Sequence, residues 1–310
     1  MKVKQSIPKE LRFTVAQFYK KFPDDDACLE YLKEKRYPGG ITHCEKCQHE
    51  RKHHRVSGRP AYSCDHCGKM ISPMAGTIFE HSSTPLQTWF YAMYLMGSTR
   101  CGISAKQIQR ETGVTYKTAW RMFRQIRSLL SEGDMQLEGP TVEIDETYVG
   151  GTRKYAKGRP MRGDKVKIPV IGIVQRNGGK VYAQVVPGIT ADELTKVVKE
   201  RVTPGSTVYT DEYPSYDRIG TLTDSKGKPL AYRHRRIRHK DGVYVKGDIH
   251  TNTVEGFWAL VKNGIRGVYH QVSPEYLQSY LNEYAFRYNR RHEGNQQFNA
   301  ILERVCERAS

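Results

Sequence analysis

Two Cys-x-x-Cys pairs constrain this chain more than any other feature of its sequence. Cys44 and Cys47 form the first pair, Cys64 and Cys67 form the second, and sixteen residues lie between the pairs. Each pair lets two thiolates bind one ion from a single turn, and two such turns complete the closed tetrahedral site of a structural zinc ion. The spacing therefore predicts a zinc ribbon, and a set of free or redox-active thiols is the alternative.

The rest of the chain favours metal over disulfides. The other cysteines, Cys28, Cys101 and Cys306, are scattered, and no apolar segment of the secretory type follows the basic residues at the start. The longest apolar run, from Trp89 to Met96, is eight residues long, whereas a membrane-spanning helix needs about 20. We therefore expect a soluble, intracellular protein with no membrane partner.

The charge of the chain indicates a polyanionic partner. Its 310 residues carry a formal net charge of +17. An excess of this size favours nucleic acid as the partner, although a merely solvated basic surface would give the same count.

Changes in pattern along the chain predict an α/β multidomain protein. We expect an N-terminal helix and zinc ribbon over residues 1–75 and a helical DNA-binding region over residues 76–135. A catalytic core with a mixed β-sheet then covers residues 136–295, and a C-terminal tail covers residues 296–310.

A helix-turn-helix pattern lies in the second of these regions. Ser104 begins a helix that ends before Gly113, and Thr115 caps the next one. That second helix has an apolar face and a basic face, which is typical of a recognition helix in a DNA groove. An ordinary surface helix with a solvated basic side is the alternative. Its candidate DNA-binding residues are Lys117, Arg121, Arg124 and Arg127.

The order of elements in the core predicts an RNase H-like fold. Residues 141–149 alternate as a strand, with Val142 and Ile144 on one face and Glu143 and Asp145 on the other. A hairpin, a helix, and a short strand ending in Asp211 follow, and then a helix over residues 251–265.

Three carboxylates in this core are candidate metal ligands. Asp145, Asp211 and Glu255 could together hold two magnesium ions for phosphodiester chemistry. Asn252 and Lys262 share the helix face of Glu255, and the lysine is placed to contact a DNA end. Each acid alone could equally be a polar strand edge, and Glu143, Glu146 and Glu212 lie beside the candidates.

Two basic runs flank the acids and are expected to bind the DNA backbone. One run, over residues 233–240, includes Arg235, Arg236 and Arg238, and the other lies within residues 153–162.

Several segments, in order, resemble the bacterial insertion-sequence transposases of the DDE type, in the ISXO-like group with an N-terminal zinc ribbon. They include FPDDDACLEYL, CEKC with SCDHC, EIDETYVGG, YTDEYPSYD and HTNTVEGFWALVKNGIRGVYH. The resemblance implies that Asp145 and Asp211 are the first two catalytic aspartates. The family varies between acid and amide at the third position, so Glu255 and Asn252 both remain candidates, with Lys262 as the downstream lysine.

The resemblance also implies an activity: metal-dependent cleavage at the terminal inverted repeats of an insertion sequence and strand transfer into target DNA. It implies structural Zn²⁺, catalytic Mg²⁺ or Mn²⁺, a homo-oligomer that holds two DNA ends, and a cytoplasmic, nucleoid-associated protein in a bacterium. A DNA-binding regulator with an inactive core and an RNase H-like junction nuclease are the alternatives.

Overall fold

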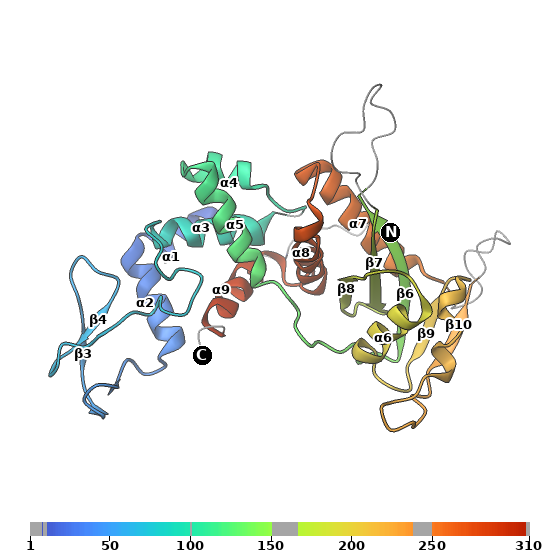
Figure 1. Ribbon diagram of the computed structural model, residues 1–310. Coiled ribbons are helices and arrows are strands. Elements are labelled where there is room, and N and C mark those ends of the chain that lie inside the picture. The colour runs from blue at the N-terminus through green and yellow to red at the C-terminus, as the bar shows by residue number, and fades with distance from the viewer. Residues whose placement is uncertain (1–7, 9–10, 100, 151–166, 238–249, 308–310) are drawn as a thin grey trace. The chain divides into compact units, whose positions relative to one another are not determined.

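The chain forms two compact units (Figure 1), which are described separately below. Unit 1 comprises Met1–Leu130 and His292–Ser310, and unit 2 comprises Ser131–Arg291. The structure is a computed structural model that describes residues 8, 11–99, 101–150, 167–237 and 250–307. Among these residues, no helix has both the length and the apolar character needed to cross a bilayer.

Unit 1 combines short ribbon strands with a group of helices. The ribbon strands are β1 (His43–Cys44), β2 (His49–Glu50), β3 (His53–Arg55), β4 (Tyr62–Cys64) and β5 (Met70–Ile71). The helices are α1 (Val15–Lys21), α2 (Asp25–Arg36), α3 (Leu86–Ser98), α4 (Ala105–Thr112), α5 (Tyr116–Ser128) and α9 (Gln297–Glu307), with the 3-10 turn η7 (Gly294–Gln296) before the last.

Local capping residues set the helix ends in this unit. The side chain of Asp24 accepts a hydrogen bond from the Ala27 amide at the start of α2. Ser104 and Thr115 cap α4 and α5 in the same way, and Gly113 ends α4 in the left-handed conformation that glycine adopts without strain. The helix-turn-helix arrangement predicted from the sequence is therefore present.

The last helix corrects the predicted C-terminal tail. Residues 297–307 form α9, which packs against α3 and belongs to unit 1. Phe298 is fully buried there, with its ring centroid 5.8 Å from that of Phe18 and 6.0 Å from that of Phe22. A Cβ atom at Gly97 on α3 would lie 2.7 Å from the Phe298 backbone nitrogen, so glycine is what lets the two helices meet. The helix has a signal in the sequence that the predicted tail left unused, because Phe298, Ile301, Leu302 and Val305 recur at helical spacing and are its buried residues.

Unit 2 is built on one five-stranded sheet. Its strands are β6 (Thr141–Val149), β7 (Ile168–Gln175), β8 (Val181–Val185), β9 (Thr207–Thr210) and β10 (Arg233–Arg236). Its helices are α6 (Ala191–Arg201), α7 (Asn252–Gly264) and α8 (Leu277–Asn289), with a π-helical turn η5 (Ile265–Tyr269) and the 3-10 turns η2 (Pro214–Tyr216), η3 (Ile219–Thr221) and η6 (Pro274–Tyr276).

The strand order and directions define an RNase H-like sheet. The order across the sheet is β10-β9-β6-β7-β8. Strands β6, β7 and β8 pair antiparallel, whereas β9 and β10 run parallel to β6 on its other side. This is the fold class that the sequence predicted.

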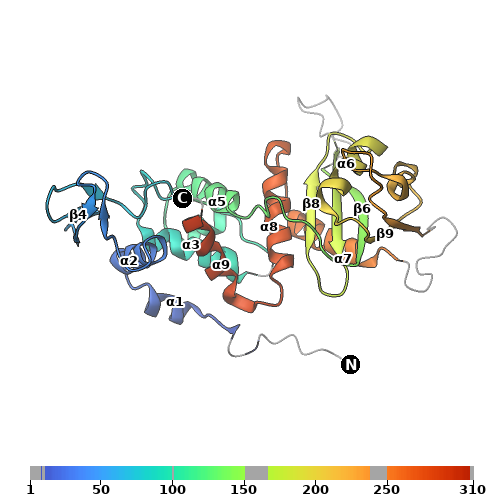
Figure 2. The same cartoon turned by 90° about the horizontal axis from the view of Figure 1, so that it is seen from below.

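Apolar residues on alternate positions bury both faces of this sheet. Val142 and Ile144 of β6 join a core that includes α6, while α7 and α8 complete a second core on the opposite face. Figure 2 shows α6 and α7 on opposite sides of the strands. Helix α7 is therefore held against the strand face that Glu143 and Asp145 share.

Candidate active site

The four ribbon cysteines converge in unit 1. Their sulfur atoms all lie within 4.8 Å of one another, with Cys44 Sγ 3.5 Å from Cys67 Sγ and Cys47 Sγ 3.9 Å from Cys64 Sγ. A tetrahedral site with Zn–S bonds of about 2.3 Å places its sulfurs about 3.8 Å apart. The cluster therefore fits a structural zinc ion. Among the described residues, no set of acids brings its ligand atoms together this tightly.

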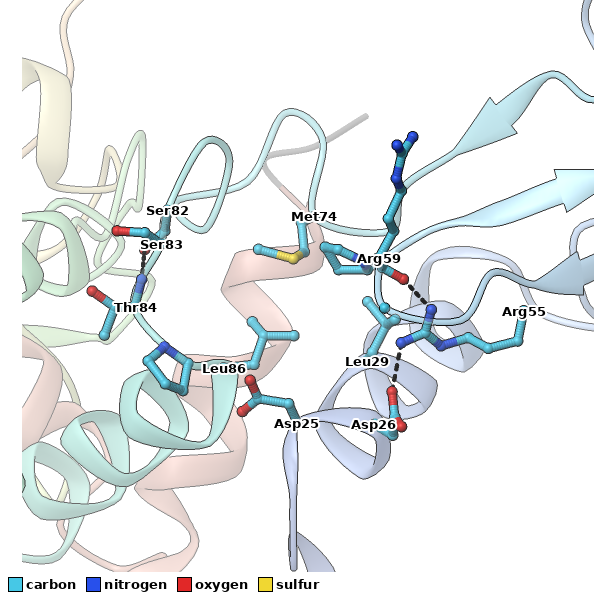
Figure 3. A pocket seen from close by; sticks show the side chains of 13 residues that line it. Asp25, Asp26, Leu29, Arg55, Arg59, Met74, Ser82, Ser83, Thr84 and Leu86 are labelled. Carbon is cyan, nitrogen blue, oxygen red and sulfur yellow. Dashed lines mark hydrogen bonds and ion pairs between the residues drawn. The ribbon is translucent and has the colours of Figure 1, made fainter.

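Ion pairs and hydrogen bonds attach the ribbon to helix α2 within the same unit. Arg55 of β3 forms an ion pair with Asp26 and also contacts the Arg59 carbonyl. Figure 3 shows these contacts at one side of a hollow of about 280 Å³, with Asp25 and Leu86 at its other side. Tyr62 of β4 donates to Glu30 of α2. The residues that line this hollow lie where the ribbon contacts α2, and the candidate acids of unit 2 are not among them.

Asp145 lies in the middle of the central strand β6, partly buried. Burial, followed by the negative charges of Glu146, Asp211 and Glu255, raises the pKa of Asp145 to about 7. The fold thus brings the three predicted acids into one electrostatic group, although they are 66 and 44 residues apart in sequence. A group of carboxylates that repel one another in a partly buried site is the donor set that a divalent cation neutralises.

Asp211 follows the last residue of β9. Its carboxylate accepts a hydrogen bond from the Tyr213 amide at 2.9 Å, which fixes the turn after the strand. Because β9 pairs in parallel with β6 and Glu143 is opposite Tyr209, Asp145 and Asp211 each come two residues later and lie level with one another.

Glu255, Asn252 and Lys262 all lie on α7. Glu255 and Asn252 are exposed in the first turn, and Lys262 is half-buried near the other end of the helix. The buried Thr251 hydroxyl donates to Glu255 Oε1 at 3.0 Å and orients that carboxylate. The charge of Glu255 acts on Asp145, whereas the uncharged amide of Asn252 has no such effect. Both residues remain candidates for the third position, because either side chain can supply an oxygen ligand.

Glu146 is a fourth acid close to the group. It accepts a hydrogen bond from the fully buried Tyr216 hydroxyl, and its pKa is raised by burial despite that bond. Since Glu146 neighbours Asp145 on β6, its side chain points to the opposite face of the sheet. Its negative charge adds to the field that acts on Asp145.

Three of the four predicted DNA-binding residues of α5 form an exposed face. Lys117, Arg121 and Arg124 are exposed and line an open groove of about 720 Å³ with Trp120, Ser83 and Thr84. Arg121 contacts the Ser82 and Thr84 hydroxyls at 3.3 Å and 3.2 Å.

Arg127 was wrongly placed on this face. It is 2% exposed, and its guanidinium lies 3.7 Å from the centroid of the Phe123 ring. Helical phase explains the error. At about 100° per residue, Arg127 lies about 80° around α5 from Lys117, on the side of the apolar face.

The arginines of the basic run before the third acid differ in their contacts. Arg235 is exposed on the edge strand β10. Arg236 instead donates to the carbonyls of Asp211, Glu212 and Tyr213 and forms an ion pair with Asp217. Its guanidinium therefore holds the loop after Asp211, and because Arg236 is also exposed its assignment to DNA binding stays a prediction. Arg238 and the run within residues 153–162 lie outside the described residues.

A four-cysteine ribbon and a mixed sheet carrying a group of acids define the class of zinc-ribbon proteins with an RNase H-like core. Two family models match the chain: a transposase zinc-ribbon domain over residues 23–70 and an ISXO2-like transposase domain over residues 136–289. The chain belongs to this family of transposases.

Two relatives are similar to this chain over different lengths. A protein in transposable element ISH50 of Halobacterium salinarum is 29% identical over 284 residues, 86% of this chain and 92% of the relative. A transposase-like protein of Haemophilus influenzae is 29% identical over 110 residues, 36% of this chain and 81% of the relative.

Among solved structures, similarity is low. The intasome of simian T-cell lymphotropic virus in complex with PP2A regulatory subunit B56 gamma matches with 15% identity and a TM-score of 0.30, covering 57% of this chain and 63% of that chain. A pre-cleavage Mos1 transpososome matches with 13% identity and a TM-score of 0.26, covering 66% and 74%.

Proposed function

We propose that this transposase binds the terminal inverted repeats of an insertion sequence, cuts a DNA strand at their ends and joins the freed end to target DNA. The observation that carries the proposal is that the pairing of β9 with β6 and the first turn of α7 bring Asp145, Asp211 and Glu255 into one group, in which burial first, and then the charges of Glu146, Asp211 and Glu255, raise the pKa of Asp145 to about 7. Asp145 and Asp211 are half-buried and Glu255 is exposed, and a bound divalent cation would neutralise the repulsion among these carboxylates.

The acids would hold the metal ions. Asp145, Asp211 and either Glu255 or Asn252 fit divalent cations such as Mg²⁺ or Mn²⁺, which when bound activate the attacking oxygen and stabilise the leaving oxygen of a phosphodiester. Thr251 keeps the Glu255 carboxylate in one orientation through its 3.0 Å hydrogen bond. Lys262, on the same helix, would neutralise a phosphate of the DNA end.

The groove along α5 supports DNA binding by unit 1. Lys117, Arg121 and Arg124 supply positive charge, while the Ser83 and Thr84 hydroxyls can bond to phosphate oxygens. Trp120, half-buried beside them, offers an apolar surface to a base edge or sugar. Because two repeat ends must be held together for transfer, we propose that the active form is a homo-oligomer.

A strand cleavage and joining assay tests the proposal. Labelled DNA carrying the element's flanking repeats is incubated with Mg²⁺ or Mn²⁺ and with the wild type or Asp145→Asn. Asp192→Asn is the control, because Asp192 is an exposed acid on α6. We expect the wild type and Asp192→Asn to cut and join, and Asp145→Asn to bind the ends without cutting them.

The other outcomes favour the alternatives. Binding without cutting by the wild type would support a DNA-binding regulator, and cutting without joining would support a nuclease. Glu255→Gln and Asn252→Ala, compared in the same assay, decide the third position, since only the true ligand should be required for cutting.

A further inference from the structure

Glu143 is a fully buried carboxylate on the strand that carries Asp145. It lies two residues before Asp145, on the same face of β6, and its side chain has no exposed surface. A buried charge of this kind is costly unless several groups compensate it. The contacts of Glu143 therefore indicate what the fold uses it for.

Its carboxylate caps helix α7. Glu143 Oε2 accepts hydrogen bonds from the backbone amides of Thr253 at 2.7 Å and Val254 at 3.1 Å. Oε1 accepts from the Thr253 hydroxyl at 2.8 Å. The first amides of a helix have no partner within the helix, and they attract negative charge. A residue 110 positions earlier in the chain thus does the work of a local N-cap.

This capping changes what the local N-cap residue does. Thr251 stands at the N-cap of α7 but makes no capping hydrogen bond with its side chain. Its hydroxyl instead donates to Glu255 Oε1. Because Glu143 satisfies the helix amides, Thr251 can orient the carboxylate of Glu255.

Arg176 and His250 complete the network. Arg176 Nε lies 2.6 Å from Glu143 Oε1, and a second nitrogen of Arg176 donates to the His250 carbonyl at 2.6 Å. The Arg176 guanidinium also lies 4.1 Å from the centroid of the Tyr209 ring. His250 Nδ1 is 3.2 Å from Glu143 Oε1.

The network joins the three elements that carry the acids, each at the same offset. Glu143 precedes Asp145 by two residues on β6, Tyr209 precedes Asp211 by two residues on β9, and Thr253 precedes Glu255 by two residues on α7. Glu143 and Tyr209 are also direct partners in the pairing of β6 with β9. A displacement of this network would move the acids relative to one another.

We infer that Glu143 is a positioning residue of the metal site: its buried carboxylate sets the place of α7, and with it the third ligand, relative to Asp145. The inference rests on the proposed metal-dependent function. If Glu143 and its contacts served stability alone, altering them would lower the unfolding temperature but would leave the metal affinity of the folded protein unchanged.

A Mn²⁺ binding experiment tests the inference without measuring DNA cleavage. The zinc-loaded full-length protein is titrated in the absence of DNA, and electron paramagnetic resonance measures the free Mn²⁺. The variants are Glu143→Gln, Asp145→Asn and a matched control, Glu283→Gln. Glu283 is also fully buried and paired with an arginine, Arg287, at 2.8 Å; it lies on α8 and accepts a hydrogen bond from the Tyr269 hydroxyl, in the turn that follows the end of α7 opposite to Glu255. Thermal unfolding is recorded for each variant.

Asp145→Asn should remove the Mn²⁺ site. Glu143→Gln should keep that site but raise its Kd for Mn²⁺ by about tenfold, the usual effect of losing a residue that orients metal ligands. Glu283→Gln should change that Kd by less than about twofold, even where its unfolding temperature falls as far. Should Glu143→Gln fail to fold, Thr253→Val removes one hydroxyl contact to Glu143 and should weaken Mn²⁺ binding more than Thr195→Val, which removes a comparable hydroxyl on α6.

Two results would overturn the inference in different ways. A folded Glu143→Gln or Thr253→Val protein that binds Mn²⁺ as tightly as the wild type would show that the network serves stability only. If the wild type has no Mn²⁺ site that Asp145→Asn abolishes, the metal site does not exist, and the proposed function fails with it.

Discussion

The indole ring of Trp258 lies so close to Gly172 that a Cβ atom at position 172 would come within 2.5 Å of Trp258 Cζ2. Gly172 is the direct partner of Asp145 in the antiparallel pairing of β6 and β7. Helix α7 therefore rests on the sheet immediately beside the first candidate metal ligand, and a missing side chain is what allows it.

Gly172→Ala should push α7 away from the sheet. Forcing a methyl group into a packed contact costs about 1–3 kcal/mol of unfolding free energy, and the displaced helix should also reduce DNA cleavage. Denaturant unfolding and the cleavage assay measure the two effects. Gly220→Ala is the control, because its added Cβ would meet only His234 Cβ at 3.8 Å; equal effects of both substitutions would contradict the prediction.

Neighbouring arginines of α5 should behave differently. Arg127→Ala removes a buried side chain stacked on Phe123 and should lower the unfolding free energy by about 2 kcal/mol. Arg124→Ala changes an exposed residue of the groove. It should leave stability within about 0.5 kcal/mol while weakening DNA binding and lowering the slope of log affinity against log salt by about 0.9. The reverse pattern would place Arg127 at the DNA.

Loss of one ribbon cysteine should release the metal. Cys64→Ser leaves three thiolates where a structural zinc ion needs four ligands, so the purified protein should hold far less than the roughly one zinc ion per chain expected of the wild type. Atomic emission measures the content. Cys101→Ser, which changes an exposed cysteine outside the cluster, should keep its zinc, and stoichiometric zinc in Cys64→Ser would refute the ligand assignment.

Acid should destabilise unit 2 through His234. Burial, then the nearby Arg236, lowers the pKa of His234 to about 4, against an opposing effect of Asp217. Between pH 6.5 and 4 the unfolded chain binds a proton that the folded chain does not, so the stabilisation is complete above pH 6.5 and falls as the pH decreases. From pH 7 to pH 5 the wild type should lose about 1 kcal/mol more than His234→Gln, because solvent at the partly exposed ring screens part of the effect. Denaturant unfolding at the two pH values checks this, and equal losses would mean that His234 titrates normally.

The contribution of α9 to unit 1 can be measured by truncating one ring. Phe298 is fully buried among the aromatic residues of α1 and α3. Phe298→Ala should therefore cost about 3–5 kcal/mol, and Phe298→Leu clearly less. Limited proteolysis and unfolding of unit 1 report the loss, and an unaffected unit 1 would mean that the helix is dispensable.

Local patterns in the sequence were sufficient for much of this architecture. The cysteine spacing predicted the ribbon, capping residues such as Ser104 and Thr115 predicted the paired helices, and alternation on β6 placed Asp145 opposite Val142. Each of these signals lies within a few residues, and the resulting element order was enough to predict an RNase H-like sheet.

What the sequence did not reveal depends on helical phase in one case and on partners far away in the chain in the others. Arg127 looked basic and exposed until helical phase brought it onto the side of the apolar core. Arg236 lies in a basic run that suggested DNA contact, yet β10 places it beside the carbonyls after Asp211. Glu143 was noted only as a neighbour of Asp145, because the helix that it caps begins more than a hundred residues later.

Helix α9 also fixes an order of maturation during synthesis. Unit 2 ends at Arg291, before α9 begins, whereas unit 1 needs that helix to close the aromatic core around Phe18. A nascent chain could thus complete unit 2 while unit 1, although begun first on the ribosome, still waits for α9. Premature termination after Arg291 would yield a protein able to bring the acids of unit 2 together but not to complete unit 1.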